Sequence, residues 1–201
     1  MRFFIKIREQ RLLRVRRYVG LPRVVSQSLL AIIAVFAFST FSAYAGTLVI
    51  GDSISAQVTS WPSYYRELTG KHVMVIAQNG RTIRDFTLPN DLRAEDNLDN
   101  VFYFLGANDA FQSTRLPLLK ERVITHLRFL KDRGFKVTVI LVPEFAGREV
   151  SVRKVNAILV KKAKALNMPV VDLMPVWDTS LTSDTVHPLP ELSKIIASYL
   201  L

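Results

Sequence analysis

The chain has 201 residues, of which 27 are Lys or Arg and 17 are Asp or Glu, so its formal net charge is +10. It contains no cysteine, which excludes disulfide bonds, a thiolate nucleophile and a lipid-modified cysteine. Most of the charge lies at the start of the chain, because residues 46–201 hold 19 basic and 16 acidic residues, a net charge of +3. A domain so close to neutrality predicts no nucleic-acid partner.

Residues 1–45 have the pattern of an export signal. An apolar stretch at residues 29–41 follows eight basic residues, and Ala43-Tyr44-Ala45 places small residues at the two positions that a signal peptidase recognises. This predicts a signal peptide that is cleaved before Gly46 and a protein that is periplasmic or secreted. The alternative is a leader that stays attached as a membrane anchor, although the stretch is shorter than the roughly 20 residues that span a bilayer. We expect membrane contact only through this leader.

Residues 46–201 alternate short apolar runs with longer amphipathic stretches, which is typical of an α/β fold with a parallel sheet. The predicted strands are residues 47–50, 72–77, 100–105, 136–142 and 169–173. The predicted helices are residues 60–69, 116–133, 151–166 and 189–200. The segment 89–100 is the most loop-like part. The length suits one domain with one core.

Polar and glycine motifs follow several of these strands. Because the carboxyl ends of parallel strands meet at one edge of the sheet, we expect these motifs to lie close together. A neutral hydroxyl attacks a carbonyl only when a base takes its proton and fixed donors receive the developing negative charge. The motifs supply each of these parts: Gly51-Asp52-Ser53, Gly80, Gly106-Ala107-Asn108-Asp109 and Asp184-Thr185-Val186-His187-Pro188.

The spacing of Asp184 and His187 suits an acid and base pair. The carboxylate of Asp184 is expected to accept from Nδ1 of His187, which leaves Nε2 free to take a proton from Ser53. A polar turn that caps the last helix is the alternative interpretation of this segment. Asp172 and Asp178 are rival acids, but neither is tied to His187 by local spacing.

Three donors are predicted to surround the carbonyl oxygen of a substrate: the backbone N–H of Ser53, the backbone N–H of Gly80 and the side-chain amide of Asn108. The Asn79-Gly80 pair favours a turn with positive φ, and Gly106 allows a sharp turn after a strand. Turn formation alone is an alternative role for both glycines. Asp52 and Asp109 are expected to fix their loops and not to take part in the chemistry.

In this order and combination, the four motifs resemble the blocks of the SGNH hydrolases, also called GDSL esterases or lipases. The resemblance covers nearly all of residues 46–201 and is closest to the small periplasmic acyl-ester hydrolases. It implies a flavodoxin-like three-layer α/β/α sandwich with five parallel strands, and a catalytic mechanism without cofactor or metal. It also implies that Ser53 is the nucleophile, that Asp184 and His187 complete the triad, and that Ser53, Gly80 and Asn108 form the oxyanion hole.

Short to medium acyl esters, thioesters and lysophospholipids are the substrates that the resemblance implies. We expect Phe111 to line an acyl groove and Arg81, directly after the donor glycine, to give the pocket a charged rim. A carbohydrate O-acetyl esterase or acetyltransferase with the same triad is the alternative that Arg81, Arg84 and Gln112 favour. A non-catalytic α/β module that binds an anion is a further alternative. The oligomeric state is left open.

Overall fold

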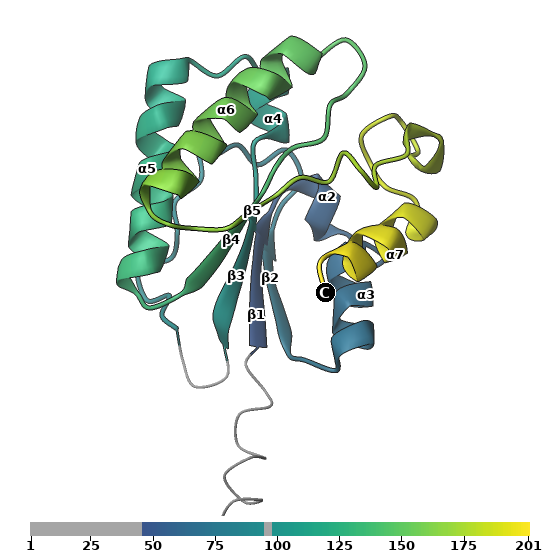
Figure 1. Ribbon diagram of the computed structural model, residues 1–201, viewed down its shortest axis with the longest axis horizontal. Coiled ribbons are helices and arrows are strands. Elements are labelled where there is room, and N and C mark those ends of the chain that lie inside the picture. The colour runs from purple at the N-terminus through teal and green to yellow at the C-terminus, as the bar shows by residue number, and fades with distance from the viewer. Residues whose placement is uncertain (1–45, 95–97) are drawn as a thin grey trace, which may run out of the picture. The chain divides into compact units, whose positions relative to one another are not determined.

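The computed structural model describes residues 46–94 and 98–201, which form one α/β domain (Figure 1). The predicted leader lies outside these residues. Five parallel strands form one sheet in the order β2-β1-β3-β4-β5, which is the flavodoxin-like order. The strands are β1 (Gly46–Gly51), β2 (Val73–Ala77), β3 (Leu98–Phe104), β4 (Lys136–Ile140) and β5 (Val170–Val171). The predicted fold class is therefore confirmed.

Helices cover both faces of this sheet (Figure 1). On one face α3 (Trp61–Thr69) packs against α7 (Pro190–Tyr199), and on the other α5 (Leu116–Asp132) packs against α6 (Glu149–Ala165). Every residue of β1 is buried, as expected for a central strand with helices on both sides. Trp61 is also fully buried and Trp177 nearly so, and both belong to the core.

The ends of the predicted elements differ from the observed ones by a few residues. The largest difference is β5, which has two residues where the periodicity predicts five, because its pairing with β4 is limited to Val139 with Val170 and Ile140 with Val171. β3 begins at Leu98, inside the segment predicted as a loop, because that residue pairs with Gly46 of β1. An apolar run predicts which residues are buried, but partner strands decide how many of them join the sheet.

Three short elements are absent from the prediction: α2 (Ser53–Ala56), α4 (Ala107–Phe111) and the 3-10 turn η1 (Thr179–Leu181). One turn of helix is too short to show a periodic apolar pattern. Two of these elements matter for the site, since α2 begins at Ser53 and α4 contains Asn108. Both follow their strands at the upper end of the sheet in Figure 1.

No helix within residues 46–94 and 98–201 combines the length and the apolar character that crossing a membrane requires.

Candidate active site

Ser53 is the first residue of α2 and is separated from the end of β1 only by Asp52. Gly51 makes this position possible: a Cβ atom there would lie 2.6 Å from the side chain of Ser55, so the strand passes into the helix only without a side chain. Asp52 caps α2 by accepting a hydrogen bond from the Ile54 N–H at 3.1 Å. The hydroxyl of Ser53 is therefore held at the carboxyl end of the sheet and is partly exposed.

A short loop before α7 brings His187 to this serine. Nε2 of His187 lies 2.9 Å from Oγ of Ser53, and Nδ1 lies 2.6 Å from Oδ2 of Asp184. A carboxylate oxygen only accepts, so Nδ1 carries the proton and Nε2 is the acceptor for the serine hydroxyl. The expected line of hydroxyl, imidazole and carboxylate is thus present, across 134 positions of sequence.

Asp184 also organises the loop that carries His187. Its Oδ1 accepts hydrogen bonds from the N–H of Val186 at 3.1 Å and of His187 at 2.8 Å. Burial opposes the ionisation of Asp184, but the N–H and imidazole of His187 and the N–H of Val186 outweigh it and lower the pKa of the carboxyl. The rival acids do not contact His187: Asp172 accepts from Met174 and Asp178 caps η1.

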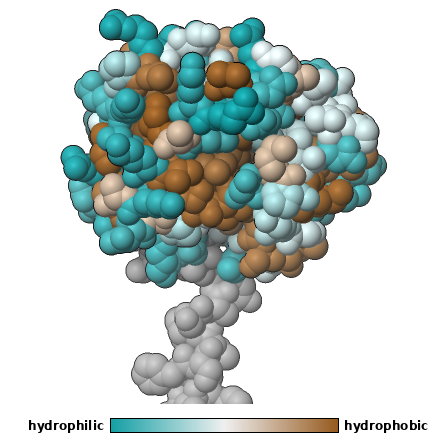
Figure 2. All heavy atoms as spheres, turned by 45° about the horizontal axis from the view of Figure 1, so that its top comes forward, coloured by the Kyte–Doolittle hydropathy of each residue, from teal (hydrophilic) through white to brown (hydrophobic). Residues whose placement is uncertain are grey.

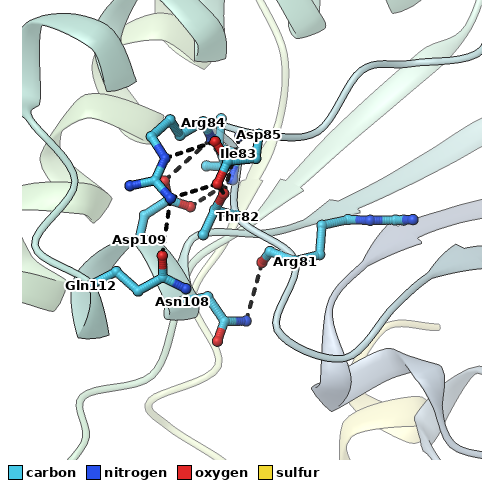
Figure 3. A network of polar contacts seen from close by, with 8 residues as sticks. All are labelled: Arg81, Thr82, Ile83, Arg84, Asp85, Asn108, Asp109 and Gln112. Carbon is cyan, nitrogen blue, oxygen red and sulfur yellow. Dashed lines mark hydrogen bonds and ion pairs between the residues drawn. The ribbon is translucent and has the colours of Figure 1, made fainter.

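Gly80 and Asn108 are the other two predicted donors. Gly80 lies in the segment that follows β2, and Asn108 forms a hydrogen bond to the next residue of that segment. Gly80 has φ +73°, as the predicted turn requires, and within the described residues its N–H has no hydrogen-bond acceptor. Asn108 donates one N–H of its side chain to the carbonyl of Arg81 at 3.1 Å (Figure 3). A side-chain amide has two N–H donors, so one of them remains for a substrate.

Asp109, the neighbour of Asn108, ties the same segment to α4. Its buried carboxylate accepts from the N–H of Ile83 at 2.6 Å and of Arg84 at 3.4 Å (Figure 3). Burial raises the pKa of Asp109 despite these donors. Gly106 enables the turn before α4: its φ is +127°, and a Cβ atom would lie 2.8 Å from Cγ1 of Val155. Asp109 therefore fixes the loop, as expected.

Asp52 is a second buried carboxyl beside the site. Its side chain is almost inaccessible, and burial raises its pKa from 3.8 to about 7, against the opposing effects of the Ile54 N–H and of His187. Asp109 adds to the increase as a like charge. Asp52 accepts a hydrogen bond inside its own loop, in agreement with the predicted loop-fixing role.

His126 forms a buried polar contact that the sequence did not reveal. Its Nε2 lies 3.0 Å from the carbonyl of Phe86, which only accepts, so Nε2 carries the proton and Nδ1 accepts from the hydroxyl of Tyr103 at 2.9 Å. Burial lowers the pKa of His126 to about 4, so the ring is neutral at neutral pH. The contact anchors the segment after β2 to α5 and β3. The one usable signal was a histidine among apolar residues on a predicted helix.

The two residues predicted to contact substrate each pack against an aromatic ring. Phe111 is half-buried at the end of α4, stacked on Phe145 with ring centroids 5.6 Å apart. The carbonyl of Arg81 faces Asn108, while its side chain runs the opposite way (Figure 3), and its guanidinium covers the ring of Phe86 at 4.2 Å.

The described residues contain no group of three His, Cys, Asp or Glu side chains close enough to hold a metal ion.

The sequence profile of the GDSL-like lipase/acylhydrolase family matches residues 49–194, which include every motif residue above. A comparison with curated proteins finds no match.

Among solved structures, the chain is similar to a protein described as lipolytic and of the G-D-S-L family from Desulfitobacterium hafniense. The TM-score is 0.70 and the identity 20%, with 78% of this chain and 97% of that chain covered. The acetyl xylan esterase AlAXEase has a TM-score of 0.64 at 17% identity, covering 77% of this chain and 97% of its own. A GDSL-like lipase from Bacteroides thetaiotaomicron has a TM-score of 0.59 at 19% identity, with 78% and 85% covered.

The solved structures establish the fold, and the family profile, which spans most of the chain, establishes the family. The chain belongs to the GDSL-like lipase/acylhydrolase family, that of the SGNH hydrolases, and is a serine ester hydrolase.

Proposed function

We propose that Ser53 hydrolyses carboxylic esters through a covalent acyl-enzyme, with His187 as the general base and acid and Asp184 as its partner. The contact of His187 with Ser53 on one side and Asp184 on the other carries this proposal. The hydrogen bond from Nδ1 to Asp184 leaves Nε2 of the imidazole facing Ser53, and the lowered pKa of Asp184 keeps its carboxylate ionised.

In the first half of the reaction, Oγ of Ser53 attacks the ester carbonyl carbon while its proton passes to Nε2 of His187. The tetrahedral intermediate collapses, and the alcohol leaves with that proton. Water then attacks the acyl-enzyme, again with proton transfer to Nε2. The carbon–oxygen bond to Ser53 breaks, Oγ regains the proton, and a carboxylic acid is released.

The oxyanion of each tetrahedral intermediate would be held by the backbone N–H of Ser53, the backbone N–H of Gly80 and the second N–H of the Asn108 amide. Hydrogen bonds from Asn108 to Arg81 and from Ile83 to Asp109 support this role, because they keep the two donor loops together before substrate binds. Each such donor typically lowers the barrier by about 3 kcal/mol.

Short to medium acyl esters, thioesters and lysophospholipids are the proposed substrates. A groove of 630 Å³ is lined by Ser55 and Ala56, in the helix that Ser53 starts, and by Val58, Pro62 and Val75, which supply apolar walls. Figure 2, in which the upper end of Figure 1 comes forward, shows hydrophobic surface between hydrophilic side chains. A mixed surface of this kind suits an amphiphilic ester.

A carbohydrate O-acetyl esterase or acetyltransferase is the second candidate function. Beside Asn108, Arg84 donates to Oε1 of Gln112 at 3.1 Å and pairs with Asp85, which makes this part of the surface polar (Figure 3). The similarity to an acetyl xylan esterase points in the same direction.

Labelling with a fluorophosphonate probe tests the nucleophile. The wild-type protein should be labelled and should hydrolyse p-nitrophenyl esters with a burst of product, whereas Ser53→Ala should show neither. The matched variant Ser55→Ala changes a serine in the same helix that instead accepts from Trp61 Nε1, and it should keep the labelling. Persistent labelling of Ser53→Ala would refute the proposal.

We also propose that the protein is exported and that the leader is removed before Gly46. The basic and then apolar pattern of residues 1–45 supports this proposal. N-terminal sequencing of the protein recovered from an exporting cell should begin at Gly46, and a start at Met1 in a membrane fraction would favour the anchor.

A further inference from the structure

A polar hollow of 280 Å³ borders the proposed oxyanion donor Gly80. We call it the 78–87 hollow, after the segment that lines it, and its walls include the side chains of Gln78, Asn79, Arg81, Asp85 and Thr87. Gly80 itself lines the hollow, so a group bound there lies beside the residue whose N–H would hold the substrate carbonyl oxygen. Its volume is near the lower end of the range for small-molecule sites, which suits one sugar ring.

The wall of the hollow is held in place before any ligand binds. The guanidinium of Arg81 lies over the ring of Phe86, donates to the carbonyl of Ile76 at 2.7 Å and donates to Oε1 of Gln78 at 3.3 Å. Arg81 also links the hollow to the site, because its carbonyl receives the hydrogen bond from Asn108. Preorganisation of this kind reduces the entropy lost on binding.

Two side chains in the hollow have polar groups without a protein partner. Among the hydrogen bonds of residues 46–94 and 98–201, none involves the side chain of Asn79 or of Thr87. Together with the free edge of the guanidinium, they offer an amide, a hydroxyl and N–H donors to a ligand. Such a mixed set of donors and acceptors matches hydroxyl groups, each of which donates and accepts.

The charged groups around the hollow already have partners within the protein. Arg84 donates to Oδ1 of Asp85 at 2.8 Å and also pairs with Oδ2, and hydrogen bonds from Arg84 and Thr82 lower the pKa of Asp85 to about 2. Arg81 donates to the carbonyl of Ile76 and to Gln78. A neutral hydroxyl can bond to the remaining N–H groups and to Asn79 and Thr87 without bringing a new charge into the hollow.

We propose that the 78–87 hollow binds the alcohol side of the ester and that this alcohol is rich in hydroxyl groups, as in an O-acylated sugar. The inference rests on the proposed function, since Ser53 must attack a carbonyl held beside Gly80. It adds to that function the recognition of a leaving group, through Asn79, Thr87 and the fixed guanidinium of Arg81.

Two substrates with the same acetyl group but different alcohols show the effect of the leaving group alone. Methyl xyloside monoacetate and p-nitrophenyl acetate give the same acetyl-enzyme, so only their alcohol sides differ. In the double variant Asn79→Ala/Thr87→Val, the ratio of kcat/KM on the sugar ester to kcat/KM on p-nitrophenyl acetate should fall about tenfold, as expected for two lost hydrogen bonds. Thr125→Val, which changes an exposed threonine on α5, should keep the wild-type ratio.

Binding of the free alcohol separates this inference from the catalytic proposal. Methyl xyloside should bind to the Ser53→Ala protein, and adding Asn79→Ala and Thr87→Val should weaken that binding about tenfold in an NMR titration. An unchanged ratio in the double variant, or sugar binding that ignores both substitutions, would overturn the inference even if p-nitrophenyl acetate is hydrolysed. A loss confined to lysophosphatidylcholine hydrolysis would also overturn it, in favour of a headgroup site. Hydrolysis of both acetates by Ser53→Ala at the wild-type rate would instead refute the proposed function, on which the inference rests.

Discussion

Replacing Asp52 by Asn should make the stability of the protein much less sensitive to a rise in pH from about 4 to about 7. The folded protein raises the pKa of this carboxyl from 3.8 to about 7, so the folded state binds the proton more tightly than the unfolded state. Its contribution to stability is therefore full at low pH and is lost as the pH rises from about 4 to about 7. Asn keeps an oxygen that can accept the hydrogen bond of the Ile54 N–H, and it cannot ionise.

The size of the effect follows from the two pKa values. The difference between the folded and unfolded pKa values corresponds to a contribution of about 4 kcal/mol to the free energy of unfolding when Asp52 is fully protonated. About 3 kcal/mol of this contribution is lost between pH 5 and pH 8. The free energy of unfolding of Asp52→Asn, relative to the wild type, should thus rise by about 3 kcal/mol over this interval. Any constant cost of burying the amide cancels, because both proteins are compared at both pH values.

Urea unfolding followed by the fluorescence of the two tryptophans, Trp61 and Trp177, measures this difference. Asp178→Asn is a control at an exposed capping position, where the pKa is lowered by hydrogen bonds from Ser180. It should lack the increase between pH 5 and pH 8. A relative stability of Asp52→Asn that stays constant over this interval would refute the reasoning, because it would mean that Asp52 ionises normally in the folded protein.

Three further outcomes are expected. Asn108→Ala should lower kcat on p-nitrophenyl acetate by about 100- to 1000-fold with a small effect on KM, and a change in KM alone would contradict its role as an oxyanion donor. Gly106→Ala should cost about 3 kcal/mol of stability in urea, since φ is +127° and the new Cβ lies 2.8 Å from Val155. Gly147→Ala, with positive φ but open space, should cost about 1 kcal/mol, and equal losses would be inconsistent with the close contact. Tyr103→Phe should cost about 1–2 kcal/mol, because buried Nδ1 of His126 loses its donor, and unfolding indistinguishable from the wild type would argue against that bond.

Periodicity in the sequence was enough to predict the layers of this fold. The apolar faces of the helices follow from apolar residues that recur every 3.6 residues, and the buried strand β1 follows from an uninterrupted run of apolar residues. Both patterns are local, so they do not depend on how distant segments of the chain pack together. The short elements were not predictable in this way. α2 and η1 begin at loop residues that cap them, Asp52 for Ile54 and Asp178 for Ser180, whereas α4 follows the positive-φ turn at Gly106.

The candidate site was likewise predicted in part from the sequence and decided in part by the tertiary structure. The sequence by itself identified Ser53, Gly80, Asn108, Asp184 and His187, because each belongs to a short motif whose residue types suit ester chemistry. Only the tertiary structure decided that Nε2 of His187 lies 2.9 Å from a serine 134 positions away, and that His126 supports the segment after Gly80. The buried state of Asp52 and the 78–87 hollow also appeared only there. Motifs reflect local chemistry, whereas distances, burial and pKa values depend on which distant segments the sheet brings together.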